Sequence, residues 1–363
     1  MKSAIEAIYH IRCEAGAIEE RARAVAVEQS VEMPVAAIED ERVLGEIVGE
    51  VRAIRDLGAG IFEARIGLNA KTTGDDAGQL INMLFGNASL LDDVVLHDAI
   101  LPPGMLEAFG GPRQGFAEIR ARVGAGRRAL TCSALKPQGL DSAALAALAR
   151  RFAQGGVDYI KDDHGLADQA YSPFAERVAA VAAALRSGGY KTRYVPSLTG
   201  DLDKLRREIG NAREAGIDTV MLAPMVSGVS NMHALARDNP DMAILAHPAL
   251  GGAARIAPPL LIGKLFRLFG AGAVVFPNYG GRFGYSRETC AALARAALDE
   301  WGKMRPCVPV PAGGMKLKRI PELLDFYGAE VMLLIGGDLL AARERLVEET
   351  KAFVASVEGY AYG

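Results

Sequence analysis

Residues 155–169 read GGVDYIKDDHGLADQ, in which an apolar run suited to a buried strand ends in Lys161, Asp162, Asp163 and His164. Four consecutive ionisable side chains are costly to bury, so their place at the end of an apolar strand needs a reason. Parallel barrels carry their chemistry at the carboxyl ends of the strands and in the loops that follow. The stretch therefore predicts a strand of such a barrel with a reactive site at its end.

Side chains alternate along a strand, so Tyr159, Lys161 and Asp163 share one face. We expect Lys161 and Asp163 to point into the mouth of the barrel and Asp162 to point toward the surrounding helices. His164 follows the strand and can turn back into the mouth.

The same rhythm repeats from about residue 129 to the end of the chain: a short apolar run, then Gly, Pro or Asp, then a helix pattern rich in Ala, Leu and Arg. The apolar runs cover residues 128–135, 157–163, 192–198, 217–224, 242–248, 273–278, 307–314 and 331–337. Alternating strands and helices indicate a parallel sheet, and eight units indicate a (β/α)₈ TIM barrel. The alternative is an open doubly wound sheet, which has fewer repeats and usually a G-x-G-x-x-G turn that this chain lacks. We therefore predict a barrel over residues 111–363.

Residues 1–110 do not follow this rhythm. Strands are expected at 5–13 and 60–69, and helical segments at 17–30 and 41–58. Residues 101–115, rich in Pro and Gly, mark a boundary. These features predict a small α+β N-terminal domain of ferredoxin-like type in front of the barrel.

Composition excludes several classes of protein. The 363 residues carry a net charge of −3 without a block of Lys or Arg, which argues against binding to nucleic acid or to an anionic membrane surface. No apolar stretch is long enough to predict a membrane span. The four cysteines form no C-x-x-C pair, so we expect reduced thiols and a cytoplasmic location.

Reactive side chains recur at the strand ends: Lys136 after the first barrel strand, Lys161 and Asp163 after the second, and His247 after the fifth. Two neighbouring ammonium groups lower a lysine pKa and make its neutral amine available as a base. Such an amine can also take up carbon dioxide as a carbamate, which with Asp163 would offer oxygen ligands to Mg²⁺. The alternative is a structural ion pair between Lys161 and Asp163.

Two glycine pairs follow the last two strands, Gly313 with Gly314 and Gly336 with Gly337. Barrels commonly bind phosphate at this place through backbone N–H groups. Tight turns are the alternative explanation.

Seven segments together resemble the RuBisCO large-chain superfamily. They are AVEQSVE (26–32), FGNASL (85–90), SALKPQGL (133–140), GGVDYIKDDHG (155–165), ILAHPALGG (244–252), VPVPAGGM (308–315) and LLIGGDLL (333–340). The resemblance makes Lys136 a catalytic lysine, Lys161 a carbamylated lysine, Asp163 a metal ligand and His247 the histidine of the fifth strand. It assigns the two glycine pairs to phosphate binding. It also implies a homodimer in which Glu28 and Asn87 reach the partner's site.

The departures from the family pattern are informative. His164 replaces the Glu that serves as the third metal ligand, so its role as a ligand or as a general base stays open. The loop PNYGGRFGYS (277–286), with Asn278 and Arg282, lacks the lysine that carboxylases hold over carbon dioxide. Pro248, Pro277 and Ala312 stand where the family binds a second phosphate. The resemblance thus implies a RuBisCO-like protein that forms a Mg²⁺-stabilised enediolate from a monophosphorylated substrate and is not a carboxylase.

Several reactions share such an enediolate. We rank first the decarboxylation or C–C hydrolysis of a phosphorylated 3-oxo sugar acid of the 3-oxo-isoapionate 4-phosphate type. The second interpretation is an isomerase or enolase of methionine salvage that acts on a phosphorylated ketose of the 5-methylthioribulose 1-phosphate type. The third is a relative without catalytic activity.

Overall fold

The computed structural model describes residues 4–362 and divides into two compact units. One contains residues up to Gly110 together with Leu250–Leu261, and the other contains Gly111–Ala249 and Ile262 to the C-terminal end. Residues 1–3 of the predicted N-terminal domain and residue 363 of the predicted barrel lie outside the described part. The segment Leu250–Leu261 follows the fifth barrel strand, and the sequence analysis had placed it with the barrel.

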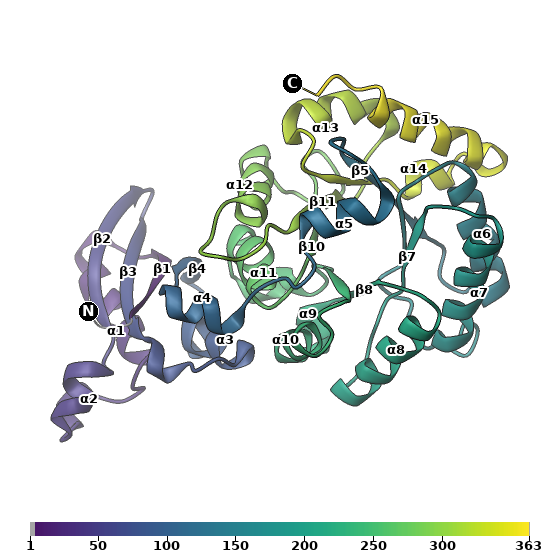
Figure 1. Ribbon diagram of the computed structural model, residues 1–363. Coiled ribbons are helices and arrows are strands. Elements are labelled where there is room, and N and C mark those ends of the chain that lie inside the picture. The colour runs from purple at the N-terminus through teal and green to yellow at the C-terminus, as the bar shows by residue number, and fades with distance from the viewer. Residues whose placement is uncertain (1–3, 363) are drawn as a thin grey trace. The chain divides into compact units, whose positions relative to one another are not determined.

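The N-terminal unit is an antiparallel sheet with helices between its strands (Figure 1). Its strands are β1 Ala4–Arg12, β2 Glu50–Gly58, β3 Ile61–Asn69 and β4 Val94–Ile100. Its helices are α1 Ile18–Glu28, α2 Glu41–Glu46, α3 Ala77–Phe85 and α4 Pro103–Phe109. The spatial order β2-β3-β1-β4, with α1 and α3 as crossovers, is the ferredoxin-like arrangement, which confirms the predicted class.

One prediction in this unit was wrong. The helical spacing over 41–58 predicted one helix, but α2 ends at Glu46 and residues 50–58 form strand β2. Gly49 lies between them, where a Cβ atom would come within 2.4 Å of the carbonyl oxygen of Ala26 in α1. The chain turns at this close contact and enters the sheet, so tertiary packing overrides the local helical pattern. Strand β4 was not predicted at all.

The second unit contains eight parallel strands, all within the predicted runs. They are β5 Leu130–Leu135, β6 Tyr159–Asp162, β7 Arg193–Val195, β8 Thr219–Leu222, β9 Ala243–Ala246, β10 Ala273–Pro277, β11 Val308–Ala312 and β12 Met332–Leu334. They form two ladders, β12-β5-β6-β7 and β8-β9-β10-β11. A parallel bridge between Ser197 and Met221 joins β7 to β8, and β11 lies beside β12. The eight strands thus close into the predicted barrel.

Helices follow the strands and surround them, except α5, which precedes β5 and packs against the interior cluster (Figure 1). They are α5 Phe116–Val123, α6 Ser142–Gln154, α7 Phe174–Ser187, α8 Leu202–Glu214, α9 Pro224–Ser227, α10 Val229–Asp238, α11 Phe266–Leu268, α12 Arg287–Leu298, α13 Ile320–Tyr327, α14 Gly337–Leu340 and α15 Leu346–Glu358. A π-helical segment, Pro259–Leu265, precedes α11. Over residues 4–362, no helix has the length and apolar character needed to cross a membrane.

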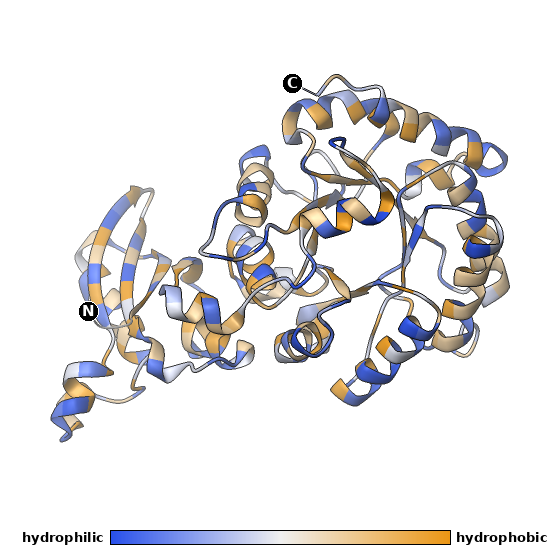
Figure 2. Ribbon diagram, viewed as in Figure 1, coloured by the Kyte–Doolittle hydropathy of each residue, from blue (hydrophilic) through white to orange (hydrophobic). Residues whose placement is uncertain are grey.

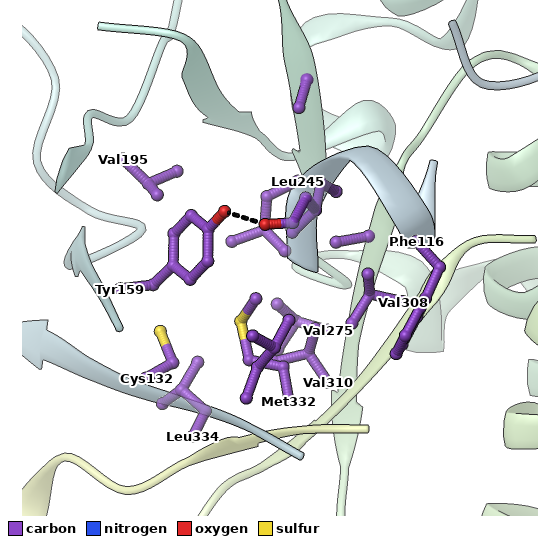
Figure 3. Packing of buried hydrophobic residues seen from close by; sticks show 14 of the residues in the cluster. Phe116, Cys132, Tyr159, Val195, Leu245, Val275, Val308, Val310, Met332 and Leu334 are labelled. Atoms are coloured by element: carbon purple, nitrogen blue, oxygen red, sulfur yellow. Dashed lines mark hydrogen bonds between the residues drawn. The ribbon is translucent and has the colours of Figure 1, made fainter. Parts of the chain in front are cut away.

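The barrel helices carry apolar residues on one side and polar residues on the other (Figure 2). Inside the barrel, apolar side chains from all eight strands and from α5 form one buried cluster (Figure 3). Tyr159 in this cluster donates its hydroxyl hydrogen to the carbonyl oxygen of Ile119 in α5, 2.7 Å away. Tyr159 and Lys161 are two residues apart on β6, so both side chains point into the barrel. The buried apolar cluster therefore lies next to Lys161, on the side away from the barrel mouth.

Candidate active site

Five of the predicted side chains gather at the carboxyl ends of β5, β6 and β9. Lys136 follows β5, Lys161 lies in β6, Asp163 and His164 follow β6, and His247 follows β9. Because parallel strands present their carboxyl ends at one rim, side chains far apart in sequence meet here. The contacts described below connect Lys136, Asp163, His164 and His247, and Lys161 is bonded to the backbone of Asp162, next to Asp163.

Lys161 is almost completely buried, with 4% of its surface exposed. Its Nζ donates a hydrogen bond to the backbone carbonyl oxygen of Asp162, 2.7 Å away. Burial lowers the pKa of Lys161, and the charge of Lys136 lowers it further, while Asp163 and Asp162 act in the opposite direction. The structure therefore favours the neutral amine, the form that reacts with carbon dioxide or accepts a proton.

Asp163 is the centre of the cluster. Its carboxylate forms an ion pair with Lys136 and accepts hydrogen bonds from Gln138 Nε2 at 3.3 Å and from the backbone N–H of Gly165 at 3.0 Å. Burial raises the pKa of this carboxyl, but the bonds from Lys136 and Gly165 outweigh burial and hold the pKa well below its usual range. Asp163 is therefore an anion at neutral pH, and its ion-pair partner is Lys136 rather than Lys161.

The two histidines of the site stack on one another. The ring centroids of His164 and His247 are 4.3 Å apart and the ring planes differ by 5°. Nδ1 of His247 accepts the N–H of Ala249 at 3.2 Å, so the ring proton of His247 lies on Nε2. Burial lowers the pKa of both imidazoles, and for His247 it is the largest cause of a pKa of about 2. Both rings are thus neutral at neutral pH.

His164 and Lys136 contact different oxygens of the Asp163 carboxylate. Its Nδ1 is 3.4 Å from Asp163 Oδ1, and 48% of its side chain is exposed. A carboxylate beside Nδ1 favours the proton on that atom, which leaves the Nε2 lone pair free. His164 can therefore accept a proton from a molecule in the mouth of the barrel.

Asp162 points toward the helix layer, as predicted, and is completely buried there. Its carboxylate accepts hydrogen bonds from Arg177 Nε of α7 at 3.1 Å, from the hydroxyl of Tyr194 at 2.7 Å and from the backbone N–H of Ser197 at 3.0 Å. Because the carbonyl of Asp162 receives the hydrogen bond of Lys161, this network fixes the position of the amine.

Arg177→Met should destabilise the protein by about 3–5 kcal/mol, because it leaves the buried Asp162 carboxylate without its countercharge. Tyr194→Phe is the matched control: it removes one hydrogen bond to the same carboxylate and should cost about 1 kcal/mol. Urea unfolding of both variants measures the difference. Equal losses of unfolding free energy would contradict the assignment of Arg177 as the essential countercharge.

The donor set fits Mg²⁺ only if Lys161 is modified. Among residues 4–362, no three His, Cys, Asp or Glu side chains are placed to hold a metal ion together. Asp163 is one oxygen donor, and a carbamate on the buried amine of Lys161 would be a second. Mg²⁺ commonly binds one or two carboxylates and keeps its waters, and it prefers oxygen to imidazole nitrogen. Asp163 and a Lys161 carbamate therefore suit this ion, and His164 suits it poorly.

The glycines after β11 lie against the loop after β10. Gly313 and Gly314 have φ angles of 86° and 98°, which side chains other than glycine rarely adopt. The N–H of Arg282 donates to the carbonyl oxygen of Gly313 at 2.9 Å, and a Cβ on Gly313 would lie 3.0 Å from the ring of Phe283. Both glycines thus permit close packing of this loop. Phosphate binding at these glycines stays a prediction.

The second glycine pair is tied to the first through Asp338. Gly336 and Gly337 follow β12, and Asp338 accepts from Lys316 Nζ at 2.8 Å and from the N–H of Leu317 at 2.9 Å. These contacts join the loops after β11 and β12. Their backbone N–H groups therefore belong to adjacent loops at one end of the barrel.

Asn278 is 1% exposed and is held by its neighbours. Its Oδ1 accepts from the hydroxyl of Tyr327 at 2.6 Å, and its Nδ2 donates to the carbonyl oxygen of Tyr279 at 3.0 Å. Asn278 therefore anchors the loop after β10, while Arg282 in the same loop is exposed.

Glu28 and Asn87, the two predicted site residues of the N-terminal unit, contact each other. Asn87 Nδ2 donates to Glu28 Oε1 at 2.8 Å and to Glu32 Oε1 at 3.0 Å. Two segments 59 residues apart thus form one cluster of polar side chains. Glu32 belongs to this cluster but was not among the predicted site residues.

The residues that hold the reactive side chains carry little signal in the sequence. Gln138 lies two residues beyond Lys136 and contacts Asp163. Its position just after the end of a barrel strand is the one sequence signal that could have identified it as a site residue. Arg177 and Tyr194 come from a helix and a different strand, and nothing in the local sequence distinguishes them.

Comparisons with known proteins agree with this geometry. The family model for the ribulose bisphosphate carboxylase large chain, catalytic domain, matches residues 115–342. A 5-methylthioribulose-1-phosphate isomerase from Rhodospirillum rubrum is 58% identical over 99% of this chain and 98% of its own length. A 2,3-diketo-5-methylthiopentyl-1-phosphate enolase from Geobacillus thermodenitrificans is 34% identical over 78% of this chain and 71% of its own length. The solved structure of a Rubisco-like protein from Rhodopseudomonas palustris covers 100% of both chains with 53% identity and a TM-score of 0.94.

Proposed function

Because the chain belongs to the RuBisCO large-chain family and is a RuBisCO-like protein, we propose that it isomerises a phosphorylated methylthio-ketose of the 5-methylthioribulose 1-phosphate type. The observation that carries the proposal is the cluster of Lys136, Lys161, Asp163, His164 and His247 in a chain 58% identical to an isomerase named for that compound. From the sequence alone, this interpretation ranks second. The similarity to an isomerase and an enolase supports it better than the decarboxylase or hydrolase ranked first.

The reaction follows from the chemistry of such a ketose. The carbonyl is at C2, C1 carries the phosphate, and C3 carries a hydroxyl group and a hydrogen. Removal of the C3 proton gives an enediolate over C2 and C3. Return of a proton to C2, together with movement of the hydroxyl proton from O3 to O2, leaves the carbonyl at C3 and a hydroxyl at C2. No atom is gained or lost, so the reaction needs one group that accepts a proton and others that stabilise the oxyanion.

The proposed roles follow from the contacts of each side chain. His164 accepts the proton through Nε2, since its Nδ1 faces Asp163. The Lys136 ammonium, held by Asp163 and 41% exposed, stabilises the oxyanion from the mouth of the barrel. His247 supports the same oxygen as a neutral Nε2–H donor.

Two ends of the substrate need different surroundings. The N–H groups of Gly313, Gly314, Gly336 and Gly337 are proposed to bind the single phosphate. Pro277 and Ala312 lie side by side at the ends of β10 and β11, are partly exposed and carry no charge. We propose that the uncharged methylthio end faces these two residues.

Asp163 and a carbamate on Lys161 are proposed to hold Mg²⁺. When bound, the ion supplies Lewis-acid stabilisation of the enediolate oxygens. The protein's own part is to keep the Lys161 amine neutral by burial and fixed through the carbonyl of Asp162.

The proposal is tested by ³¹P and ¹H NMR of 5-methylthioribulose 1-phosphate incubated with the protein, Mg²⁺ and bicarbonate. An isomer of the same mass is expected. A parallel incubation with a phosphorylated 3-oxo sugar acid should release no carbon dioxide, and release from it without isomerisation of the ketose would favour decarboxylation.

We also propose a homodimer with shared sites, in which Glu28 and Asn87 of one chain serve the barrel of the other. Lys161→Met and Asn87→Ala chains should each be inactive alone and should recover up to about a quarter of wild-type activity after mixing, since half of the dimers are hybrids with one intact site. Each variant mixed with itself is the control. Absence of recovery after mass spectrometry confirms hybrid dimers would contradict shared sites.

A further inference from the structure

The turn after β7 connects the helix layer to the reactive lysine. Its residue Ser197 donates its N–H to Asp162 Oδ2 at 3.0 Å, and the carbonyl of Asp162 accepts from Lys161 Nζ at 2.7 Å. Two residues further on, the N–H of Thr199 donates to Glu208 Oε2 of α8 at 3.1 Å. A short chain of contacts thus runs from Glu208 to Lys161.

Glu208 is an unusual anchor for this turn. It is 3% exposed, and its second carboxyl oxygen, Oε1, is buried without a hydrogen-bond partner. The nearest cation is Lys204, whose Nζ is 3.7 Å from that oxygen. The same Nζ is 3.6 Å from Asp168 Oδ2, so Glu208 shares this cation with a second carboxylate. An anion in such surroundings is only partly compensated.

The groups that face Glu208 come from three elements. Lys204 lies on its own helix, Asp168 in the loop after β6 and Arg177 on α7. Burial raises the pKa of Glu208 to about 7, Asp168 raises it as well, and the Thr199 N–H, Lys204 and Arg177 lower it. Both protonation states are therefore populated near neutral pH.

We propose that Glu208 is a positioning residue for the reaction: its carboxylate holds the Ser197–Thr199 turn and, through Asp162, the amine of Lys161. The effect of Glu208 on the reaction rate rests on the proposed function. Its effect on the Ser197–Thr199 turn does not. The anionic carboxylate accepts the Thr199 N–H in a charge-assisted bond, and protonation weakens that bond. The turn is thus held firmly above about pH 7 and less firmly below.

Amide hydrogen exchange tests the effect on the turn without substrate. In the wild-type protein, the protection factor of peptides that cover residues 197–201, corrected for the intrinsic exchange rate, should rise about fivefold between about pH 5.5 and about pH 8.5. Glu208→Gln should give a flat profile, because the amide has no charge to gain. Lys204→Met should move the midpoint to higher pH, because it removes the nearest cation. A flat wild-type profile, or the wild-type inflection in Glu208→Gln, would overturn the proposal.

The pH profile of kcat tests the effect on the reaction. The wild-type profile should contain an inflection near pH 7 that Glu208→Gln lacks, and the variant should stay about fivefold below the wild-type plateau. Lys204→Met keeps the carboxyl group and should shift this inflection upward. If exchange shows the inflection and kcat does not, Glu208 holds the turn without positioning the reaction, and the proposal is overturned. If no substrate is turned over by any variant, the exchange result still decides whether Glu208 controls the turn.

Discussion

A Lys161→Met protein should turn over the proposed substrate at least about a thousandfold more slowly than the wild type and should no longer respond to bicarbonate or Mg²⁺. Methionine has a similar length but can neither form a carbamate nor accept a proton. The amine it replaces is 4% exposed and held by the carbonyl of Asp162. Activity assays with and without bicarbonate, together with ¹³C NMR of the carbamate after labelling with ¹³CO₂, measure the effect.

The melting temperature separates this role from a structural one. Burying an amine costs free energy that burying methionine does not, so the Lys161→Met protein should melt at the same temperature as the wild type or higher. A large fall in melting temperature would show that Lys161 supports the fold. An unchanged response to bicarbonate in the variant would contradict the carbamate.

A Lys136→Met protein should lose about 10²–10³-fold in kcat, because it lacks the cation that stabilises the enediolate oxygen. Lys136 is the ion-pair partner of Asp163 and is 41% exposed at the mouth of the barrel. The Michaelis constant should change much less than kcat if the ammonium acts mainly in the transition state. Steady-state kinetics with the proposed substrate measure both values.

Gln138→Leu is the matched control, because Gln138 contacts the same carboxylate at 3.3 Å from the same segment of chain. It should reduce kcat by less than about tenfold, the worth of one hydrogen bond. If both variants lose activity equally, the function of Lys136 is only to hold Asp163.

Most of the barrel could be predicted because each of its strands has a local signal. All eight strands fall within apolar runs bounded by Gly, Pro or Asp. The N-terminal sheet was predicted less well. Strand β2 is largely exposed, with Val51 and Ile54 only partly covered, so its apolar residues do not alternate as they do in a half-buried strand. Their spacing fits a helix instead, but the close contact of Gly49 with α1 directs the chain into the sheet.

The reactive side chains could be predicted and their supports could not. Lys136, Lys161 and His247 were expected to lie at one rim because parallel strand ends share it, and the structure places all three at the carboxyl ends of their strands. Their roles in the reaction stay a prediction. Arg177 and Glu208 lie within amphipathic helices, where charged residues are common. Only the packing of α7 and α8 brings them to Asp162 and Thr199.

The central claim is that the site moves a proton next to a ketone through an enediolate. The most direct measurement is incubation of 5-methylthioribulose 1-phosphate with the protein, Mg²⁺ and bicarbonate in D₂O, followed by ¹H NMR and mass spectrometry. We expect an isomeric ketose that carries deuterium from the solvent at the carbon that received the proton. A ketose recovered unchanged and without deuterium, under conditions in which the protein is folded and the Lys161 carbamate is detected, would contradict the account.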